Sequence, residues 1–559
     1  MHRPIDVRLL DASPALSRVD TVLRDHLLPL AVYFTAFAVL TWPALGSFTT
    51  ALYGGYDDLP QNLWDLWWVN KALTELGQSP YHTTWLHYPA GTSLIGHTLS
   101  PLNGLIAIPL QRVLRLPVVY NLLLVVSFPI TGWATYWLCR TWSASRGGAL
   151  LGGFLFAFSA YRCGHAHNHL WLITALQWMP LYLLCLLRLL TQPSIPRALF
   201  AAGALLLVTA TELQYVLHCG IAGALLYGIR AWRTRSLIFA LRRPYVLPFA
   251  TFLLTSAATS GVFVWALMST SARDPLYGTQ NPRVYSADLL SPFIPGGVWR
   301  FGAWTEAYWG LFHQGWIETS IYLGWGAILL GILAWRHRPR PTPTAYIWCA
   351  SIIVVFYALS LGPVLRVWDT PTVVPMPYAL LTRILPFFKM AGVTVRFMVL
   401  PMLALAVLAS CGWTWLARDL TRWRIAGLAA LLAFILFETF PRPMLLTSPE
   451  VPPWVQALRR MPDSGGIVDL VTYPSDCLYH QTVHEKPFAF GYISREPASV
   501  AMEKLLKELA IRQKDYVQLH ERWKYDYLIA PASPPIAGLE VLYEDATVRI
   551  YSLRPRQMP

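Results

Sequence analysis

Apolar runs of about twenty residues recur along this chain as far as residue 440 and then stop. An α-helix needs a run of that length to cross roughly 30 Å of hydrocarbon. The pattern predicts an α-helical polytopic membrane protein with eleven spans, or twelve if residues 99–115 also cross rather than lie on the surface. The eleven spans are expected near 27–45, 117–138, 148–161, 170–188, 198–211, 213–229, 245–268, 318–335, 345–363, 394–417 and 424–440.

Composition and charge agree with this class. Of the 559 residues, 55% are hydrophobic and 14% aromatic, which excludes an ordinary soluble globular protein. The formal charge of +14 could indicate nucleic acid as a partner, but the arginines occupy short loops between the apolar runs. Positive charge in such loops marks the cytoplasmic side, so we exclude nucleic acid and expect a cytoplasmic N-terminus. The loops that carry acids and histidines then face outward.

A second unit follows the last span. The Pro-rich stretch after Pro441 indicates a linker, and beyond it we expect strands at 467–473 and 525–530, a helix at 498–514 and a hairpin at 539–553. The predicted organisation is a cytoplasmic segment (1–26), a transmembrane domain (27–440) with its first outer loop at 46–116, and a small outer α/β domain with its linker (441–559). Only Cys477 of the seven cysteines falls in that domain, so we expect neither a disulfide framework nor a Cys-based zinc site.

The first outer loop carries an acidic pair, Asp57 and Asp58, in a chain that is only 13% charged. Carboxylates at the mouth of a transmembrane bundle are costly unless they are paired or used. We therefore predict that one of them is a catalytic base, with Asp57 as the first choice and Asp58 as the second. The alternative for Asp58 is structural, because an Asp before Leu-Pro is a good N-cap for a helix that starts near Leu59.

The order of elements resembles the GT-C class of membrane glycosyltransferases over about residues 20–440. The segments DDLPQNLWDLWW, PYHTTWLHYPAGTSLIGHTLSPLNG and FAFSAYRCGHAHNHL, and HQTVHEKPFAFGYISR in the outer domain, are more narrowly similar to a poorly characterised bacterial group that includes YfhO-like proteins. The resemblance implies a bacterial inner-membrane enzyme of the cell envelope. It would transfer a sugar from a polyprenyl-phosphate donor to a glycan, lipid or protein acceptor on the outer face, with the first-loop aspartate as base.

Three histidines, His165, His167 and His169, stand just outside a predicted span. Only His165 and His169 would share a face in a helix. Together with Asp58 they could hold a divalent metal such as zinc or manganese, since imidazole and carboxylate are ordinary ligands. The alternative is that they are hydrogen-bonding residues at the interface, and GT-C enzymes include both metal-dependent and metal-independent members.

The departing lipid phosphate requires a cation. Outward cations are unusual in this orientation, and those we expect at the donor phosphate are Arg162, Lys389 and Arg396. Arg396 lies near the start of an apolar helix, whose N-terminus would also attract an anion. Residues expected to position substrate, with structural roles as the alternative, are His97, Glu212, Glu306, His313 and Glu318.

Two rival functions remain open at this point. A transporter or flippase of lipid-linked glycans would show paired halves with broken helices near mid-membrane, and the sequence shows no internal repeat. A non-catalytic membrane assembly protein would depend on its outer domain rather than on Asp57 or Asp58.

Overall fold

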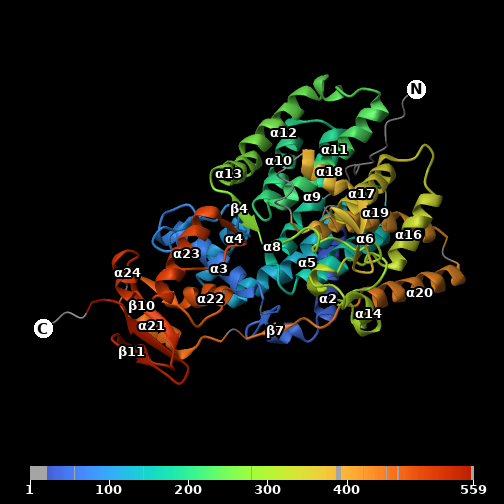
Figure 1. Ribbon diagram of the computed structural model, residues 1–559. Helices are drawn as coiled ribbons and strands as arrows, with labels where there is room; N and C mark the ends of the chain where they lie inside the picture. Colours follow the sequence, from blue (N-terminus) through green and yellow to red (C-terminus); the bar gives the residue numbers. More distant parts are fainter. Residues whose placement is uncertain are drawn as a thin grey trace.

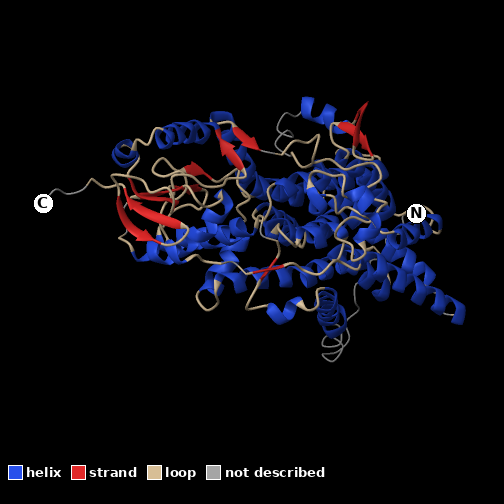
Figure 2. Cartoon of the chain, turned by 60° about the horizontal axis from the view of Figure 1, so that its bottom comes forward, coloured by secondary structure: helices blue, strands red, loops and turns tan. Residues whose placement is uncertain are grey.

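The structure is a computed structural model that describes residues 22–555, except residues 56, 143, 279, 385–391, 420, 449 and 463–464. Helices dominate the chain as far as Thr439, and the one sheet of four strands lies among the described residues of the C-terminal unit, which we define as residues 441–555. The two parts lie side by side, with the C-terminal sheet at one end of the molecule and the apolar helices at the other (Figures 1 and 2).

The helical part contains long apolar helices joined by short ones. Its α-helices are α2 Leu28–Leu40, α3 Leu59–Asn70, α4 Pro101–Gln111, α5 Leu116–Thr141, α6 Arg146–Ala157, α7 Ala160–His165, α8 Leu170–Ala175, α9 Trp178–Thr191, α10 Ile195–Thr209, α11 Gln214–Thr234, α12 Val246–Ala258, α13 Ser260–Arg273, α14 Glu306–Trp309, α15 Gly315–Glu318, α16 Trp325–Arg336, α17 Thr344–Ser360, α18 Pro377–Ile384, α19 Val399–Leu416 and α20 Arg422–Thr439. Its short strands are β1 Leu52–Tyr53, β2 His82–Thr83, β3 Thr92–Ser93, β4 Leu276–Gly278, β5 Val364–Val367 and β6 Thr370–Pro375.

Helices α5, α6 and α19 form the centre of this part, with α2 packed on α5, and α16 and α17 packed on α19 (Figure 1). Helix α19 is apolar all round and almost entirely buried, as expected of a helix surrounded by others. Gly412 allows the close approach of α16, because a Cβ at this position would collide with the Leu330 carbonyl oxygen. Small residues at such contacts let membrane helices pack backbone to backbone.

The predicted count of eleven spans is not confirmed. Among the described residues, four helical stretches are long and apolar enough to cross a membrane: Leu23–Leu40, Leu116–Thr141, Leu170–Thr191 and Thr394–Leu416. A fifth is the pair α12 and α13, which bends by 41° at Thr259. Four further predicted spans correspond to shorter apolar helices of 10–17 residues, at Arg146–Ala157, Ile195–Thr209, Trp325–Arg336 and Thr344–Ser360. The chain is therefore a helical membrane protein whose apolar runs are more often interrupted than their composition suggests.

The C-terminal unit has the predicted α/β composition. Its elements are β7 Leu446–Thr447, α21 Pro453–Arg460, β8 Gly466–Asp469, α22 Pro474–His484, β9 Arg495–Pro497, α23 Ala498–Arg512, α24 Tyr516–Glu521, β10 Tyr525–Pro531, β11 Glu540–Glu544 and β12 Val548–Ser552. Four strands form one sheet in the order β11-β12-β10-β8, in which only the β10–β8 pair is parallel. The predicted hairpin is present as the antiparallel pair β11–β12.

Several contacts attach the C-terminal unit to the helical part, and three of them are pairings between strands or helices. Strand β7 pairs with β1 beside the first span, and β9 pairs with β4 just after α13. Helix α22 packs on α3 of the first loop, where the Trp64 indole donates to Gln481 Oε1 at 2.7 Å. Because these contacts come from three places in the helical part, the C-terminal unit is held against the first loop.

Candidate functional site

A cavity of about 970 Å³ lies where the first loop, the ends of several helices and the C-terminal unit meet. Its lining contains two groups of residues, which we call the polar end and the apolar end. The polar end consists of Asp57, Asp58, His97, Asn168, His169, Glu212, Glu318, Arg396, Tyr492, Ser494 and Arg495. The apolar end consists of residues on or just before α11 and on α13, namely Leu213, Val216, Leu217, Ile221, Phe263, Val264, Leu267 and Met268. A mainly apolar cavity with a few convergent polar groups is the usual form of a ligand site.

Asp58 occupies the N-cap position of α3, but its side chain does not cap the helix. Its backbone carbonyl accepts from Asn62, while its Oδ2 lies 2.9 Å from Nε2 of His169. The purely structural interpretation of Asp58 as a capping side chain is therefore wrong. The carboxylate is instead paired with an imidazole at the wall of the cavity.

Asp57 faces the same cavity from a more exposed position. Its Oδ2 accepts a hydrogen bond of 3.1 Å from the Asn168 side chain, just before His169. The structure thus brings both first-loop aspartates to the residues that link α7 and α8. The hydrogen bonds between these two segments join residues that are 106 and 111 positions apart, so local sequence does not predict them.

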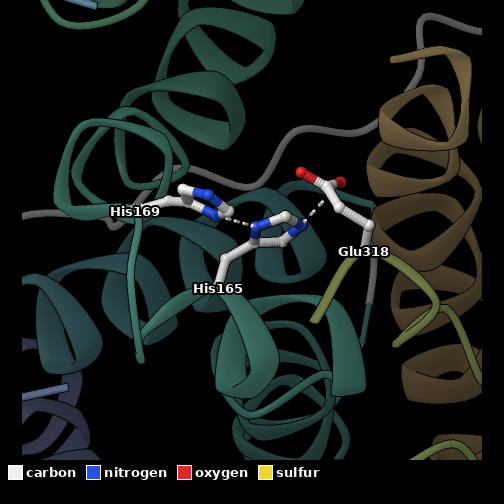
Figure 3. Close-up of side chains that lie close together, drawn as sticks. All are labelled: His165, His169 and Glu318. Carbon is white, nitrogen blue, oxygen red and sulfur yellow. Dashed lines mark hydrogen bonds and ion pairs between the residues drawn. The ribbon is translucent and has the colours of Figure 1, made fainter. Parts of the chain in front are cut away.

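A buried chain of polar groups continues behind His169. His165 lies between His169 and Glu318 (Figure 3), with its Nδ1 2.6 Å from Nδ1 of His169 and its Nε2 3.7 Å from Glu318 Oε2. The other Glu318 oxygen accepts from the Arg396 guanidinium at 2.6 Å. Five groups therefore follow one another, Asp58, His169, His165, Glu318 and Arg396, and all of them except His165 line the cavity.

Burial and pairing set the charges in this chain. Burial lowers the pKa of His165 well below its usual value, so this imidazole is neutral near pH 7. Burial alone would raise the pKa of Glu318, but the adjacent Arg396 guanidinium outweighs it and lowers the pKa to about 2. Burial raises the pKa of Glu212, whose Oε1 accepts from the Gln214 amide, and no ion pair to it is found among the described residues. The two cavity glutamates therefore differ in charge behaviour.

A metal ion would have to use the same groups. His165, His169 and Glu318 bring one ligand atom each within 4.8 Å of one another. His165 Nε2 is buried and has no hydrogen-bond partner among the described residues, and the 3.7 Å to Glu318 Oε2 is a gap that a cation about 2.1 Å from each atom would bridge. Asp58, which the sequence grouped with the histidines, contacts the other nitrogen of His169. His165, His169 and Glu318 therefore fit a site with three protein ligands, and a metal at His165, His169 and Asp58 stays a prediction.

The C-terminal unit supplies one wall of the cavity. His97 is buried in the first loop, where its Nδ1 accepts from the Ser494 amide at 3.2 Å and its Nε2 lies 3.1 Å from Asp65. Arg495 follows Ser494 and donates to the Gly96 carbonyl at 3.3 Å. Burial lowers the pKa of Arg495, and the nearby Glu212 carboxylate opposes that shift. His97 thus positions the segment that brings a second arginine into the cavity.

Three other predicted site residues, Arg162, Glu306 and His313, do not line the cavity. Arg162 is fully buried outside the cavity, where it donates to Ser127 Oγ at 2.6 Å and stacks on the Phe128 ring, so we withdraw its phosphate role. A guanidinium that was expected to face outward is used to join α7 to α5. Glu306 and His313 are exposed and do not line the cavity. Lys389 lies outside the described residues.

Sequence reasoning missed Arg495 and Asn168 as cavity residues. Asn168 was hidden between two histidines that attracted attention as ligands. Arg495 is the last residue of HQTVHEKPFAFGYISR, which was noticed only as a family likeness. That segment was the one available signal for a cavity wall in the C-terminal unit.

Comparisons with known proteins agree with this architecture. The family profile described as a domain of unknown function, DUF6311, matches residues 74–437. No curated protein sequence matches the chain. The structure is similar to the arabinofuranosyltransferase AftD from Mycobacteria, mutant R1389S, with a TM-score of 0.57 and 14% identity, over 97% of this chain and 42% of that one. The chain thus spans less than half the length of that enzyme.

Two weaker similarities are to other GT-C enzymes. ArnT from Cupriavidus metallidurans bound to undecaprenyl phosphate gives a TM-score of 0.46 at 12% identity, over 94% of this chain and 98% of that one. The oligosaccharyltransferase AglB from Archaeoglobus fulgidus, in complex with an inhibitory peptide and a dolichol-phosphate, gives 0.45 at 12% identity, over 91% and 69%. The neighbours are GT-C membrane glycosyltransferases, as the sequence predicted for the fold. The YfhO-like grouping stays a prediction.

Proposed function

The chain belongs to the DUF6311 family, and we propose that it is an inverting GT-C glycosyltransferase that uses a polyprenyl-phosphate-linked sugar as donor. One observation carries the proposal. A single cavity joins an acid–imidazole pair and two arginines at its polar end to an apolar groove between α11 and α13. A lipid-linked sugar has the same division into a charged head and an apolar tail. The fold similarity to a mycobacterial arabinofuranosyltransferase supports sugar transfer in general.

Asp58 is the proposed general base, with Asp57 as the alternative. Its carboxylate lines the cavity, and His169 lies 2.9 Å behind it. As the acceptor hydroxyl attacks the anomeric carbon, its proton would pass to Asp58, while the bond between that carbon and the phosphate oxygen breaks. Hydrogen bonding to His169 orients the carboxylate, and the His169–His165 contact continues the polar chain into the protein. Asp57, which accepts from the Asn168 side chain, would orient the acceptor.

The departing polyprenyl phosphate carries the negative charge that develops in the reaction. Arg396 and Arg495 both line the polar end of the cavity. Arg396 is already paired with Glu318, which fixes its guanidinium in place. Arg495 reaches the cavity from the C-terminal unit, beside Glu212. We propose that the pair of arginines stabilises the leaving phosphate, because preorganised cations at a developing anion lower the barrier without reorganising.

The membrane arrangement of this proposal follows the charge distribution of the sequence. The N-terminus would be cytoplasmic, and the cavity and the C-terminal unit would face the outer side of a bacterial inner membrane. Helix α13, which lines the apolar end of the cavity, also has exposed apolar side chains such as Trp265. A lipid tail could therefore reach the groove from the bilayer without crossing water. The acceptor would enter past the C-terminal wall.

The test is release of polyprenyl phosphate by the purified protein, given a set of polyprenyl-phosphate sugars and candidate acceptors. Loss of a general base lowers rates by about 10²–10⁴-fold. We expect that fall for Asp58→Asn and a smaller one for Asp57→Asn. Glu306→Gln is the matched control, since Glu306 is an exposed acid outside the cavity. Unchanged release in both aspartate variants would refute the assignment.

One observation favours the rival function of a transporter. Helices α12 and α13 form a broken apolar pair, and broken helices are common in transporters. The break at Thr259 is lined by no charged residue on either side, from Ser256 to Val262. Flux of a lipid-linked glycan across proteoliposomes, with no release of polyprenyl phosphate, would favour transport over transfer.

A further inference from the structure

Helix α23 in the C-terminal unit is oriented with its apolar side outward. Met502, Leu505, Leu506 and Leu509 are 62%, 60%, 36% and 51% exposed. Their spacing of three, four and seven residues places them in one stripe along the helix. Lys507, on the other side of the helix, is fully buried. An amphipathic helix of a soluble domain normally has the opposite arrangement.

The burial of Lys507 explains why the helix does not turn its leucines inward. Its ammonium donates to the backbone carbonyls of Tyr88 at 2.9 Å, Ala489 at 3.1 Å and His87 at 3.3 Å. A buried charge is tolerated only when it is hydrogen-bonded in this way. Rotating α23 to bury its leucines would break all three bonds. The apolar stripe is therefore a fixed surface of the folded protein.

The beginning of α23 is bound to the end of a membrane helix. Asp274, the residue after α13, accepts hydrogen bonds from the backbone amide and the hydroxyl of Ser499. Strand β9, which leads into α23, pairs with β4, which follows α13. Figure 1 shows α23 beside β4 and next to the end of α13. The helix thus starts at the level where the apolar pair α12–α13 ends.

Helix α13, which packs on α10 and α12, also has exposed apolar side chains. Val262, Trp265 and Met268 are 51%, 65% and 51% exposed, and the helix belongs to a pair that is apolar enough to span a membrane. Contiguous exposed apolar surface on a folded protein marks an interaction site. Because α23 begins where the apolar pair α12–α13 ends, the bilayer that would surround α13 is the partner expected for its apolar stripe.

We propose that α23 lies on the membrane surface, with Met502, Leu505, Leu506 and Leu509 inserted at the boundary between headgroups and acyl chains. Helices with one apolar face bind lipid in this way without crossing it. The contact would hold the C-terminal unit, and with it the cavity wall at Arg495, at a fixed height above the bilayer. The inference does not depend on the reaction catalysed, so it stands or falls separately from the proposed function.

The test uses the full chain with one added cysteine, Leu505→Cys, labelled with a small fluorophore and reconstituted in bilayers that contain lipids with a quencher on the acyl chain. The control is Val541→Cys on β11, which is 44% exposed on the sheet of the same unit. Labelling of the unsubstituted protein corrects for the seven native cysteines, which are buried or half-buried. The proposal predicts at least about a twofold greater quenching by lipid at position 505 than at 541, and less quenching by aqueous iodide.

Two results would overturn the proposal. If position 505 were quenched by lipid no more than position 541, and by iodide no less, the stripe would face water. If position 505 were protected from both quenchers, and this protection were lost when the protein is diluted in lipid, another protein chain would cover the stripe.

Discussion

The buried pair Glu318–Arg396 gives the sharpest prediction about this structure. Glu318→Gln keeps the shape of the side chain but leaves the Arg396 guanidinium buried without its counter-charge. The two side chains meet at 2.6 Å, and both are largely buried. Removing one partner of such a pair costs about 3–5 kcal/mol. The variant should therefore lose a large part of its folding free energy.

The pKa of Glu318 gives an independent magnitude. It lies at about 2 against 4.5 for a free glutamate, and at 1.36 kcal/mol per pH unit the difference corresponds to about 3 kcal/mol. A carboxylate whose pKa is lowered on folding stabilises the protein above its unfolded pKa and loses that effect as the pH falls through the folded pKa. The stability gap between wild type and Glu318→Gln should thus be full near pH 7 and shrink as the pH falls from 4.5 towards 2.

Equilibrium unfolding in mixed micelles, followed by tryptophan fluorescence, measures this gap. Glu306→Gln is the matched control and should be neutral, because Glu306 is exposed. The double variant Glu318→Gln/Arg396→Gln should be more stable than the sum of the single losses implies, since it leaves no unpaired charge. A loss below about 0.5 kcal/mol for Glu318→Gln, with additive double-variant behaviour, would refute the pairing.

Three further predictions concern packing and the cavity. Gly412→Ala should destabilise by about 1–3 kcal/mol, because its Cβ would meet the Leu330 carbonyl, whereas Gly427→Ala, with nothing within 4 Å, should be neutral or stabilising in the same unfolding assay. Burial raises the pKa of Glu212 above 4.5, so wild type should lose stability relative to Glu212→Gln as the pH rises from 4.5 through the raised pKa, which melting temperatures would report. Gln481→Ala removes three buried hydrogen bonds and should speed proteolysis of the linker at 441–452.

The sequence was informative where a property repeats along the chain. Apolar length identified the membrane helices, and alternation with turn residues located the sheet of the C-terminal unit. The number of spans was harder to predict from the sequence, because the helix breaks at Thr259 between α12 and α13 and several apolar runs form helices shorter than a membrane crossing. Composition reports how apolar a run is and says little about where its helix breaks.

The site depended on contacts that no local pattern encodes. Asp58 meets His169 across 111 residues, and Arg396 meets Glu318 across 78. The sequence analysis noticed each of these residues. Only the fold shows that Arg396 forms an ion pair with Glu318 and that Arg162 packs against α5. Arg495 was invisible for a related reason, since a C-terminal cation gives no sign that it returns to the first loop.

The order of synthesis gives the wall formed by Tyr492–Arg495 a consequence for the living cell. The ribosome completes every membrane helix before it reaches this segment, so a nascent chain can be fully inserted while its cavity is still open on one side. Arg396 and Arg495 line one cavity only once the C-terminal unit has emerged and docked on α3. The cavity is therefore complete only after the C-terminal unit has folded against the helical part.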